Sequence, residues 1–324
     1  MAVVLVTGGA GYVGSHACKA LAAAGHTPVT YDNLSRGHRE AVQWGPLEVG
    51  DLLQKERLAE VIARHNPVAV MHFAALAIVS ESVSHPERYI LNNVEGTRNL
   101  LDEMKAMNIR RLVFSSTCAI YGIPDTVPIS ESETAKPISP YGESKLRVEQ
   151  MLSLRKESDG LSSVALRYFN AAGADRDGDI GEDHDPEPHL IPNVLNAASG
   201  SQSLTVYGDT YQTTDGTCIR DYIHVSDLAD AHVLALSLLE NEPTTTFANL
   251  GTGTGYSVLE VIKEAERVTG KEIPFAVGPA RPGDPPSLVA NGAYARDLLG
   301  WAPRRSDLPT LISDAWRWHS RSNK

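Results

Sequence analysis

The sequence has 324 residues, of which 42% are hydrophobic and 21% are charged, and its formal net charge is −11. This length and balance are typical of one large soluble domain or two coupled ones. The negative charge argues against broad binding to nucleic acid or to an anionic membrane surface, because both require a wide positive surface. An anionic small molecule held by a few arginines remains compatible with it.

The three cysteines, Cys18, Cys118 and Cys218, are widely spaced and form neither a zinc-binding pattern nor a disulfide framework, so we expect no metal site. Residues 2–6 are apolar but end at once in a glycine turn, which is too short for the core of a signal peptide. No stretch of the sequence reaches the roughly 20 apolar residues of a membrane span. We therefore expect a cytoplasmic protein without a membrane partner.

Short apolar runs alternate with helical patterns over the first two-thirds of the chain. The runs predict strands at 2–7, 27–32, 67–74, 111–117 and 163–169, and the segments between them predict helices near 13–24, 55–65, 89–106 and 141–157. Continuous apolar character within the runs indicates strands buried on both faces. The pattern predicts an α/β fold of the Rossmann type, with a doubly wound parallel sheet.

The composition of the sequence changes after about residue 170. Residues 173–188 indicate a long polar loop, and residues 258–269 indicate a helix with a capping box at its start and a glycine at its end. We expect a dinucleotide-binding domain over 1–170 and a smaller C-terminal α/β substrate-binding lobe mainly over 171–324. The segment at about 216–240 is expected to pack back onto the first domain.

Three glycines follow the first predicted strand and open the first predicted helix. Gly8, Gly11 and Gly14 permit a tight turn, close approach of the backbone to a pyrophosphate, and close packing of helix on strand. Asp32 ends the next strand, where its carboxylate can bind a ribose 2′-hydroxyl and repel the 2′-phosphate of NADP. The pattern therefore favours NAD, although Arg36 lies close enough in sequence to serve a 2′-phosphate instead.

A second glycine-rich segment, residues 251–255, precedes the capped helix. No suitably spaced acidic strand end follows it. We interpret this segment as a structural turn.

A tyrosine and a lysine four residues apart, Tyr141 and Lys145, share one face of the predicted helix. To act as a base near neutral pH, the phenol needs its pKa lowered by about three units, or roughly 4 kcal/mol. The adjacent ammonium and a positive nicotinamide ring could supply that shift. Such a pair is common on helix surfaces, but here it follows a strand of a dinucleotide-binding unit. That strand ends in Ser115-Ser116-Thr117, which offers hydroxyls to a substrate oxygen.

Sequence blocks along nearly the whole chain carry a specific resemblance. They include TGGAGYVGSH at 7–16, YDNLSRG at 31–37, FSSTCAIYG at 114–122, SPYGESK at 139–145 and DGTCIRDYIHVSDLADAH at 215–232. In these blocks the sequence resembles the extended short-chain dehydrogenase/reductase family, and closely its UDP-glucose (UDP-galactose) 4-epimerases.

The resemblance implies site residues position by position. The catalytic set would be Thr117, Tyr141 and Lys145. The NAD-binding residues would be Gly8, Gly11, Tyr12, Val13, Gly14, Asp32, Asn33, Leu34, Ser35, Arg36, Gly37, Asp51, Leu52, Phe73, Ala74, Ala75, Leu76, Asn92, Tyr141, Lys145 and Phe169. The UDP-sugar-binding residues would be Thr117, Tyr141, Asn170, His189, Leu190, Thr205, Val206, Tyr207, Arg220, Arg281, Asp284 and Leu288.

The activity that the resemblance implies is the reversible interconversion of UDP-galactose and UDP-glucose in galactose metabolism. A hydride would pass from the sugar to tightly bound NAD and return to the other face of a 4-keto intermediate. Alternatives are UDP-N-acetylglucosamine or a UDP-xylose/UDP-arabinose pair. A 4,6-dehydratase is disfavoured, because Cys118 and Ala119 follow Thr117 where those lyases need an acid–base pair. The resemblance also implies a homodimer built on the helices near 89–106 and 141–157.

At three positions the residue differs from those that some members of the family carry. Ala77 stands where some members of the family carry a lysine near the cofactor, so one polar contact to the cofactor would be missing. His189 stands where some carry asparagine, and we expect of it a substrate hydrogen bond at most. Leu288 stands where the family carries either a bulky aromatic or a smaller residue beside the sugar. Its intermediate size predicts that N-acetylated sugars are accepted beside plain hexoses.

Overall fold

A computed structural model describes residues 2–281 and 283–322. Its centre is a seven-stranded parallel sheet in the order β10-β6-β5-β4-β1-β2-β3. The strands are β1 (Val3–Thr7), β2 (Thr27–Asp32), β3 (Leu47–Val49), β4 (Ala69–His72), β5 (Arg111–Thr117), β6 (Ser162–Tyr168) and β10 (Thr245–Leu250). The order reverses between β1 and β4, as in a Rossmann-type sheet, which confirms the expected fold class.

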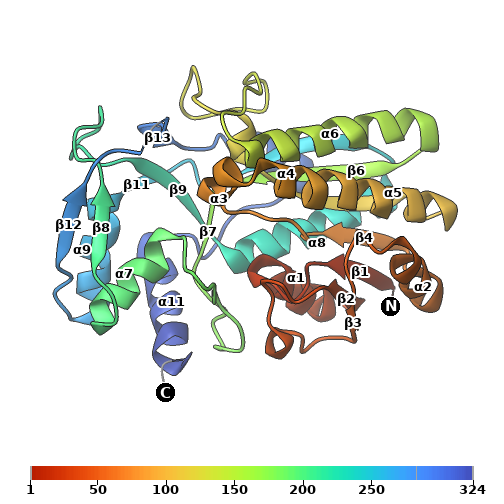
Figure 1. The fold of residues 1–324 in the computed structure, drawn as a ribbon, viewed down its shortest axis with the longest axis horizontal. Helices are drawn as coiled ribbons and strands as arrows, with labels where there is room; N and C mark the ends of the chain where they lie inside the picture. The colour runs from red at the N-terminus through yellow and green to blue at the C-terminus, as the bar shows by residue number, and fades with distance from the viewer. Residues whose placement is uncertain (1, 282, 323–324) are drawn as a thin grey trace.

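Helices cover both faces of this sheet (Figure 1). On one face, α1 (Tyr12–Ala23) and α8 (Val225–Asn241) pack against inward residues such as Val4 and Val6. On the other, α2 (Lys55–His65), α5 (Gly96–Ala106) and α6 (Pro140–Asp159) pack against residues such as Leu5. Successive side chains of a strand point to opposite faces, so a strand that is apolar throughout is buried by both helical layers.

The expected elements occur close to their predicted places, with one interruption. The helix predicted at 89–106 is divided into α4 (Pro86–Tyr89), a π-helical turn η2 (Ile90–Glu95) and α5. The short strand β3 and the sheet strand β10 were not predicted from the sequence. By contrast, α9 (Val258–Thr269) has the predicted capping box between Ser257 and Glu260 and the predicted terminal Gly270.

The remaining elements build a smaller second lobe, seen at the left of Figure 1. It contains a parallel strand pair, β8 (Leu204–Tyr207) with β12 (Phe275–Gly278). It also contains a four-stranded sheet of β7 (Asn170–Ala172), β9 (Ile219–His224), β11 (Gly255–Ser257) and β13 (Ser287–Leu288). Their core is completed by α7 (Leu190–Ser199), α9 and α11 (Leu308–Ser322). Two short helices, α3 (Val79–Ser84) and α10 (Ala293–Leu299), complete the fold.

The chain crosses between the two lobes more than once. After β9 it returns to the sheet as α8, which packs beside α1, and as β10, which pairs with β6. None of the described helices has the length and apolar character needed to cross a membrane.

The glycine-rich segment at 251–255 follows β10 and is a structural turn, as its sequence indicated. The backbone N–H groups of Thr252 and Gly253 donate to the Asp221 carboxylate at 3.0 and 3.1 Å. An internal carboxylate therefore takes the donors that a phosphate would need.

Candidate active site

The glycine turn lies at the point where the strand order reverses. A Cβ on Gly8 would come within 2.5 Å of the backbone nitrogen of Ala74, and one on Gly14 within 2.1 Å of the Gly8 carbonyl oxygen. Glycine is therefore required for the loop after β1, the loop after β4 and the start of α1 to meet this closely. The close approach leaves the first turn of α1 facing the reversal point, where a pyrophosphate fits.

A cavity opens at this point and is lined almost entirely by residues expected to bind NAD. Its lining is Gly8, Gly11, Tyr31, Asp32, Asn33, Ser35, Arg36, Gly37, Gly50, Asp51, Leu52, Phe73, Ala74, Ala75, Leu76 and Asn92. Tyr31 and Gly50 are the two that sequence reasoning missed. Both lie beside expected contacts, and Tyr31 donates from its hydroxyl to the Asp51 carbonyl at 2.9 Å. These residues fit a dinucleotide.

Asp32 is held in place before any ligand binds. Its carboxylate accepts from the backbone N–H groups of Ala10, at 3.0 Å, and Leu34, at 2.8 Å. Burial raises the pKa of Asp32, and these two hydrogen bonds oppose that rise. Arg36 is engaged elsewhere, since it donates to the Asp185 carbonyl at 3.0 Å and lies 3.5 Å from Glu81. The geometry thus favours a free ribose hydroxyl at Asp32.

The other expected NAD-binding residues lie around the cavity without lining it: Tyr12, Val13 and Gly14 in the first turn of α1, Leu34 with a left-handed backbone (φ 58°), Phe169 at the end of β6, and Tyr141 with Lys145 on α6. The hydroxyl of Tyr12 donates to the Gly173 carbonyl at 2.6 Å, which joins α1 to the chain entering the second lobe.

Thr117 and Tyr141 meet at the carboxyl end of β5. Ser139 caps α6 by accepting from the Gly142 backbone at 3.1 Å, and Pro140 is the first residue of the helix, so Tyr141 lies in its first turn. Burial raises the pKa of Tyr141 above its usual value, and a hydrogen bond with Thr117 opposes that rise. The unliganded protein therefore keeps the phenol protonated at neutral pH.

Lys145 is buried, and its ammonium is directed at the sheet. Its Nζ donates to the Ser115 carbonyl at 2.7 Å and lies 4.7 Å from the centre of the Phe114 ring. Burial lowers the pKa of Lys145 to about 7, while the charge of Glu149 acts in the opposite direction. The expected positive charge beside Tyr141 is thus weakened by the environment of the lysine itself.

The three hydroxyls at the end of β5 are not equivalent, which corrects the expectation that all are offered to substrate. Ser115 pairs with the Tyr168 hydroxyl at 2.7 Å, and Ser116 donates to Glu149 at 2.6 Å. Ser115 and Ser116 point into opposite packed faces of the sheet. Thr117 is the only one of the three that lies at the end of the strand. Cys118 is buried, and burial raises its pKa to about 12, so it cannot replace the acid of a dehydratase.

Four of the expected substrate residues form a cluster in the second lobe. Arg220 on β9 is ion-paired with Asp284 and donates to the Pro285 carbonyl at 2.9 Å. Arg281 lies over the ring of Tyr207, 4.3 Å from its centre. Two guanidinium groups held in this way are suited to a diphosphate, whose oxygens accept forked hydrogen bonds.

The remaining expected substrate residues separate into three groups. Leu288 on β13 pairs with Arg220 and packs against the cluster that contains Cys118 and Phe169, so it lies between the catalytic strand end and the arginines. Asn170 donates to the Asp221 carbonyl at 3.2 Å. Leu190, Thr205 and Val206 belong to α7 and β8, where the Val206 side chain is buried in the lobe core.

His189 does not join the substrate cluster. Its Nδ1 contacts Glu182, and its ring lies 5.5 Å from that of His184. Burial lowers the pKa of His189, but the nearby Glu182 charge outweighs this and raises it to about 10. The histidine is therefore a partner of a Glu–His cluster in the loop before α7.

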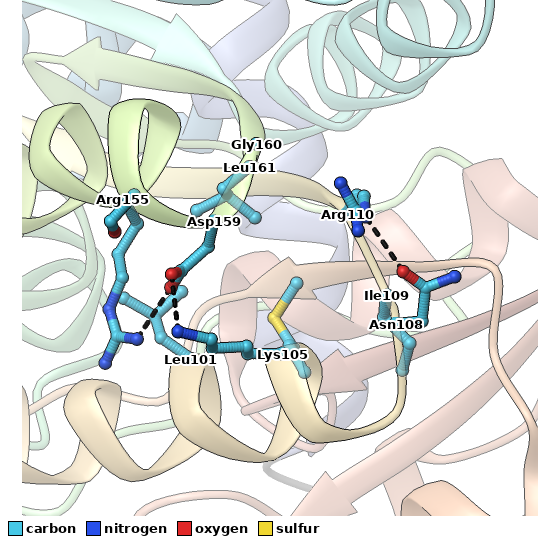
Figure 2. A pocket seen from close by; sticks show the side chains of 11 residues that line it. Leu101, Lys105, Asn108, Ile109, Arg110, Arg155, Asp159, Gly160 and Leu161 are labelled. Carbon is cyan, nitrogen blue, oxygen red and sulfur yellow. Dashed lines mark hydrogen bonds and ion pairs between the residues drawn. The ribbon is translucent and has the colours of Figure 1, made fainter.

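A second cavity lies between the C-terminal ends of α5 and α6 (Figure 2). There Asp159 binds Lys105 and Arg155, both at 2.7 Å, so its charges are already paired. Along α6 it is about 27 Å from Tyr141, at 1.5 Å per residue. Ligands of open α/β sheets bind beyond the carboxyl ends of the strands, which is the opposite edge. We assign this cavity no part in the active site.

Sequence reasoning missed the groups that hold α6 against η2. Asn93, in the π-helical turn, donates to the Ser144 hydroxyl at 2.9 Å and to the Leu76 carbonyl at 3.0 Å. Asn93 thereby links the NAD-cavity loop to the helix that carries Tyr141. Nothing in the sequence around Asn93 (NNVEGT, residues 92–97) indicated its partner on α6.

The fold and the site are those of a dinucleotide-binding enzyme. The chain matches the NAD dependent epimerase/dehydratase family over residues 4–251 and belongs to it. It is 52% identical over 322 residues to a UDP-glucose 4-epimerase of Rhizobium leguminosarum bv. trifolii, covering 99% of this chain and 98% of that one.

Solved structures of similar proteins agree with this. The UDP-glucose 4-epimerase of Brucella ovis in complex with NAD has a TM-score of 0.96 at 51% identity, with 98% of each chain covered. A UDP-glucose 4-epimerase of Stenotrophomonas maltophila, with bound NAD and formylated UDP-arabinopyranose, also has a TM-score of 0.96, at 40% identity over 100% of this chain and 99% of that one. The comparisons confirm an epimerase as the class of enzyme and NAD as the cofactor.

Proposed function

We propose that this protein interconverts UDP-galactose and UDP-glucose by inverting the configuration at C4 of the sugar. The observation that carries the proposal is the meeting of Thr117 with Tyr141 at the end of β5, across from the Arg220–Asp284 and Arg281–Tyr207 pairs. The curated relatives that are UDP-glucose 4-epimerases agree with the activity expected from the sequence.

The residues divide the work by position. Arg220 and Arg281 hold the diphosphate, which leaves the sugar free to turn about this tether. The positive nicotinamide ring of bound NAD would lower the pKa of Tyr141. The Tyr141 phenolate would then take the proton of the 4-hydroxyl and return it, while Thr117 shares the hydrogen bond so that the hydroxyl oxygen stays in place. NAD held by the residues of the cavity at the glycine turn would supply a reversible hydride acceptor for C4, so the reaction would have no net redox change. Lys145 anchors the helix that presents Tyr141.

We propose NAD binding mainly by residues 1–170 and UDP-sugar binding mainly by 171–324. We also propose that the enzyme serves galactose metabolism in the cytoplasm, where its three free cysteines remain reduced.

We further propose a homodimer through the outer faces of η2–α5 and α6. Leu100, Leu101, Met104 and Leu152 are buried inside the monomer, so they cannot form such a face. Leu91 and Leu154 remain exposed at 52% and 67% on the two helices. If the protein sediments as a monomer at micromolar concentration, the proposed dimer is contradicted. A dimer that Leu154→Glu dissociates would support it.

Product analysis tests the activity. The protein is incubated with UDP-galactose, UDP-N-acetylgalactosamine or UDP-arabinose, and the sugars are separated by chromatography. We expect UDP-glucose to form fastest, from UDP-galactose, without accumulation of NADH. NADH that accumulates with substrate would indicate a net dehydrogenase, and a 4-keto-6-deoxy product would indicate a dehydratase.

A further inference from the structure

The loop before α7 contains a regular pattern of possible metal ligands. Glu182, His184, Glu187 and His189 follow the order E-x-H-x-x-E-x-H and fold onto one another. One ligand atom from each lies within 4.8 Å of all the others. The role proposed above for the arginines and Tyr141 does not use any of these four side chains.

Three of the six distances between the ligand atoms are close to the edges of a small coordination tetrahedron. Nδ1 of His184 lies 3.1 Å from a Glu182 oxygen and 3.8 Å from a Glu187 oxygen, and Nδ1 of His189 lies 3.5 Å from Glu187. Zinc binds imidazole nitrogen and carboxylate oxygen at about 2.0–2.2 Å, which places neighbouring ligands of a tetrahedron roughly 3.4 Å apart. A fourth pair, Glu182 and His189, is hydrogen-bonded directly, so a bound ion would have to separate these two atoms.

Burial gives a second, independent reason. The Glu182 and Glu187 side chains are only 6% and 9% exposed. Within residues 2–281 and 283–322, neither carboxylate has a lysine or arginine as an ion partner. The two histidines are the only basic partners of these carboxylates among the described residues. A divalent cation held by all four side chains would neutralise the two buried carboxylates directly and let both histidines bind as neutral ligands.

The side chains are also oriented in advance. The backbone N–H of His189 donates to Glu187 at 2.9 Å, and Trp318 of α11 donates to the Glu182 carbonyl at 2.9 Å. Such supporting hydrogen bonds fix ligands in known metal sites. Four protein ligands leave no open position, which is typical of a structural site rather than a catalytic one.

We propose that Glu182, His184, Glu187 and His189 bind one Zn²⁺ ion that holds this loop in place. The zinc would clamp the loop where it meets both lobes: His184 lies edge-on to Tyr12 of α1, and Trp318 of α11 donates to the Glu182 carbonyl at 2.9 Å. The sequence had suggested no metal site because its cysteines lack a zinc pattern, and the ligands inferred here are histidines and glutamates.

The test measures metal, not turnover. Full-length protein is stripped with a chelator, dialysed against Zn²⁺ or Co²⁺, and assayed by mass spectrometry of its metal content and by the visible spectrum of Co²⁺. We expect about one ion per chain, the absorption bands of tetrahedral Co²⁺, and a higher Tm with Zn²⁺ than without it.

Two variants make the result specific to these ligands. His184→Gln combined with His189→Gln should weaken zinc affinity by at least about a hundredfold and abolish the Tm shift, because losing ligands exceeds the 10–100-fold effect of losing their supporting groups. Asp177→Asn is the matched control, since it removes a carboxylate from the separate acidic group bound by Lys19. Circular dichroism verifies that both variants fold.

Three outcomes would overturn the proposal. They are wild-type protein that takes up no metal, a bound Co²⁺ without tetrahedral bands, and a double histidine variant that keeps the wild-type affinity. If the double variant does not fold, Glu187→Gln replaces it with the same expected loss. These readouts are independent of whether the protein is an epimerase.

Discussion

The Nζ of Lys145 donates to the carbonyl oxygen of Ser115 at 2.7 Å, two residues before Thr117 on the same strand. This bond ties the helix that carries Tyr141 to the strand that carries Thr117. The lysine thus acts first on the geometry of the catalytic pair, and its own burial limits the charge it can place beside the phenol. Four consequences for the site and one for the core can be measured.

The first prediction concerns Lys145 and pH. In the folded, nucleotide-free protein its pKa is about 7, against about 10.5 when exposed. Between these values the unfolded chain holds the proton and the folded chain does not, so this group makes the protein more stable as the pH rises. The Lys145→Met variant has no titrating group at this position, so it lacks this pH dependence of stability. The wild type should therefore gain stability relative to Lys145→Met from pH 7 to pH 10, measured by urea unfolding. Parallel pH profiles would refute this.

The second prediction concerns the base. Tyr141→Phe should bind UDP-sugar nearly normally but lose at least about a hundredfold in kcat, the usual contribution of general acid–base catalysis. Tyr89→Phe is the control, because the Tyr89 ring lies 6.4 Å from that of Tyr141 while its hydroxyl donates to the Ile78 carbonyl. Near-normal kcat in Tyr141→Phe, or an equal loss in both variants, would remove Tyr141 from this role.

The third prediction concerns the cofactor. Protein stripped of nucleotide should be reactivated by NAD and at least about tenfold less well by NADP, the equivalent of about 1.4 kcal/mol. The reason is that a 2′-phosphate would meet the Asp32 carboxylate, while Arg36 is already engaged by Asp185 and Glu81. Equal reactivation by the two nucleotides would mean that Arg36 leaves these partners and binds the phosphate.

The fourth prediction concerns substrate breadth. Leu288 packs beside Cys118 and Phe169, next to the end of β5, so a larger side chain there should reduce the space beside the sugar. Leu288→Tyr should lower kcat/KM for UDP-N-acetylhexosamines by roughly 10–200-fold and spare the plain hexoses. Steady-state assays with both pairs measure this. If the wild type does not turn over UDP-N-acetylglucosamine, or if both pairs slow equally, Leu288 only packs the lobe.

The fifth prediction concerns the core under the site. Glu149 and Arg167 form a buried ion pair at 2.6 Å, and Ser116 donates to the same carboxylate. Glu149→Gln leaves the arginine charge unpaired and should cost about 3–5 kcal/mol of unfolding free energy. The control on the same helix is Glu143→Gln, whose exposed pair with Arg147 is worth at most about 0.5 kcal/mol. Similar denaturation midpoints for the two variants would contradict the difference.

Much of the fold followed from local features of the chain. Apolar runs marked β1, β2, β5 and β6, because a strand buried on both faces must be apolar throughout. The caps of α9 could be predicted from the sequence because Ser257 and Glu260 act within the first turn of the helix and Gly270 acts at its end. The NAD cavity could be anticipated for the same reason, since a glycine turn and the acid at the next strand end depend on adjacent segments.

Other features depend on contacts between distant parts of the chain. β10 enters the sheet beside β6, 82 residues earlier in register, and no local pattern states which strand will be its neighbour. From the sequence alone, the apolar residues on α5 and α6 are compatible with either a core or a dimer face, and it is the packing that places Leu100 and Leu152 inside the monomer.

Local periodicity and spacing in the sequence were enough to predict the class of fold and the glycine turn with Asp32, whereas the Thr117–Tyr141–Lys145 set was implied by the family resemblance. Only the tertiary structure decided the partners of the polar groups: Lys145 with Ser115, Ser116 with Glu149, and His189 with Glu182 rather than with the arginines of the second lobe. A buried polar group takes whichever partner the packing of distant segments brings within hydrogen-bond range, and that choice exists only in the folded chain.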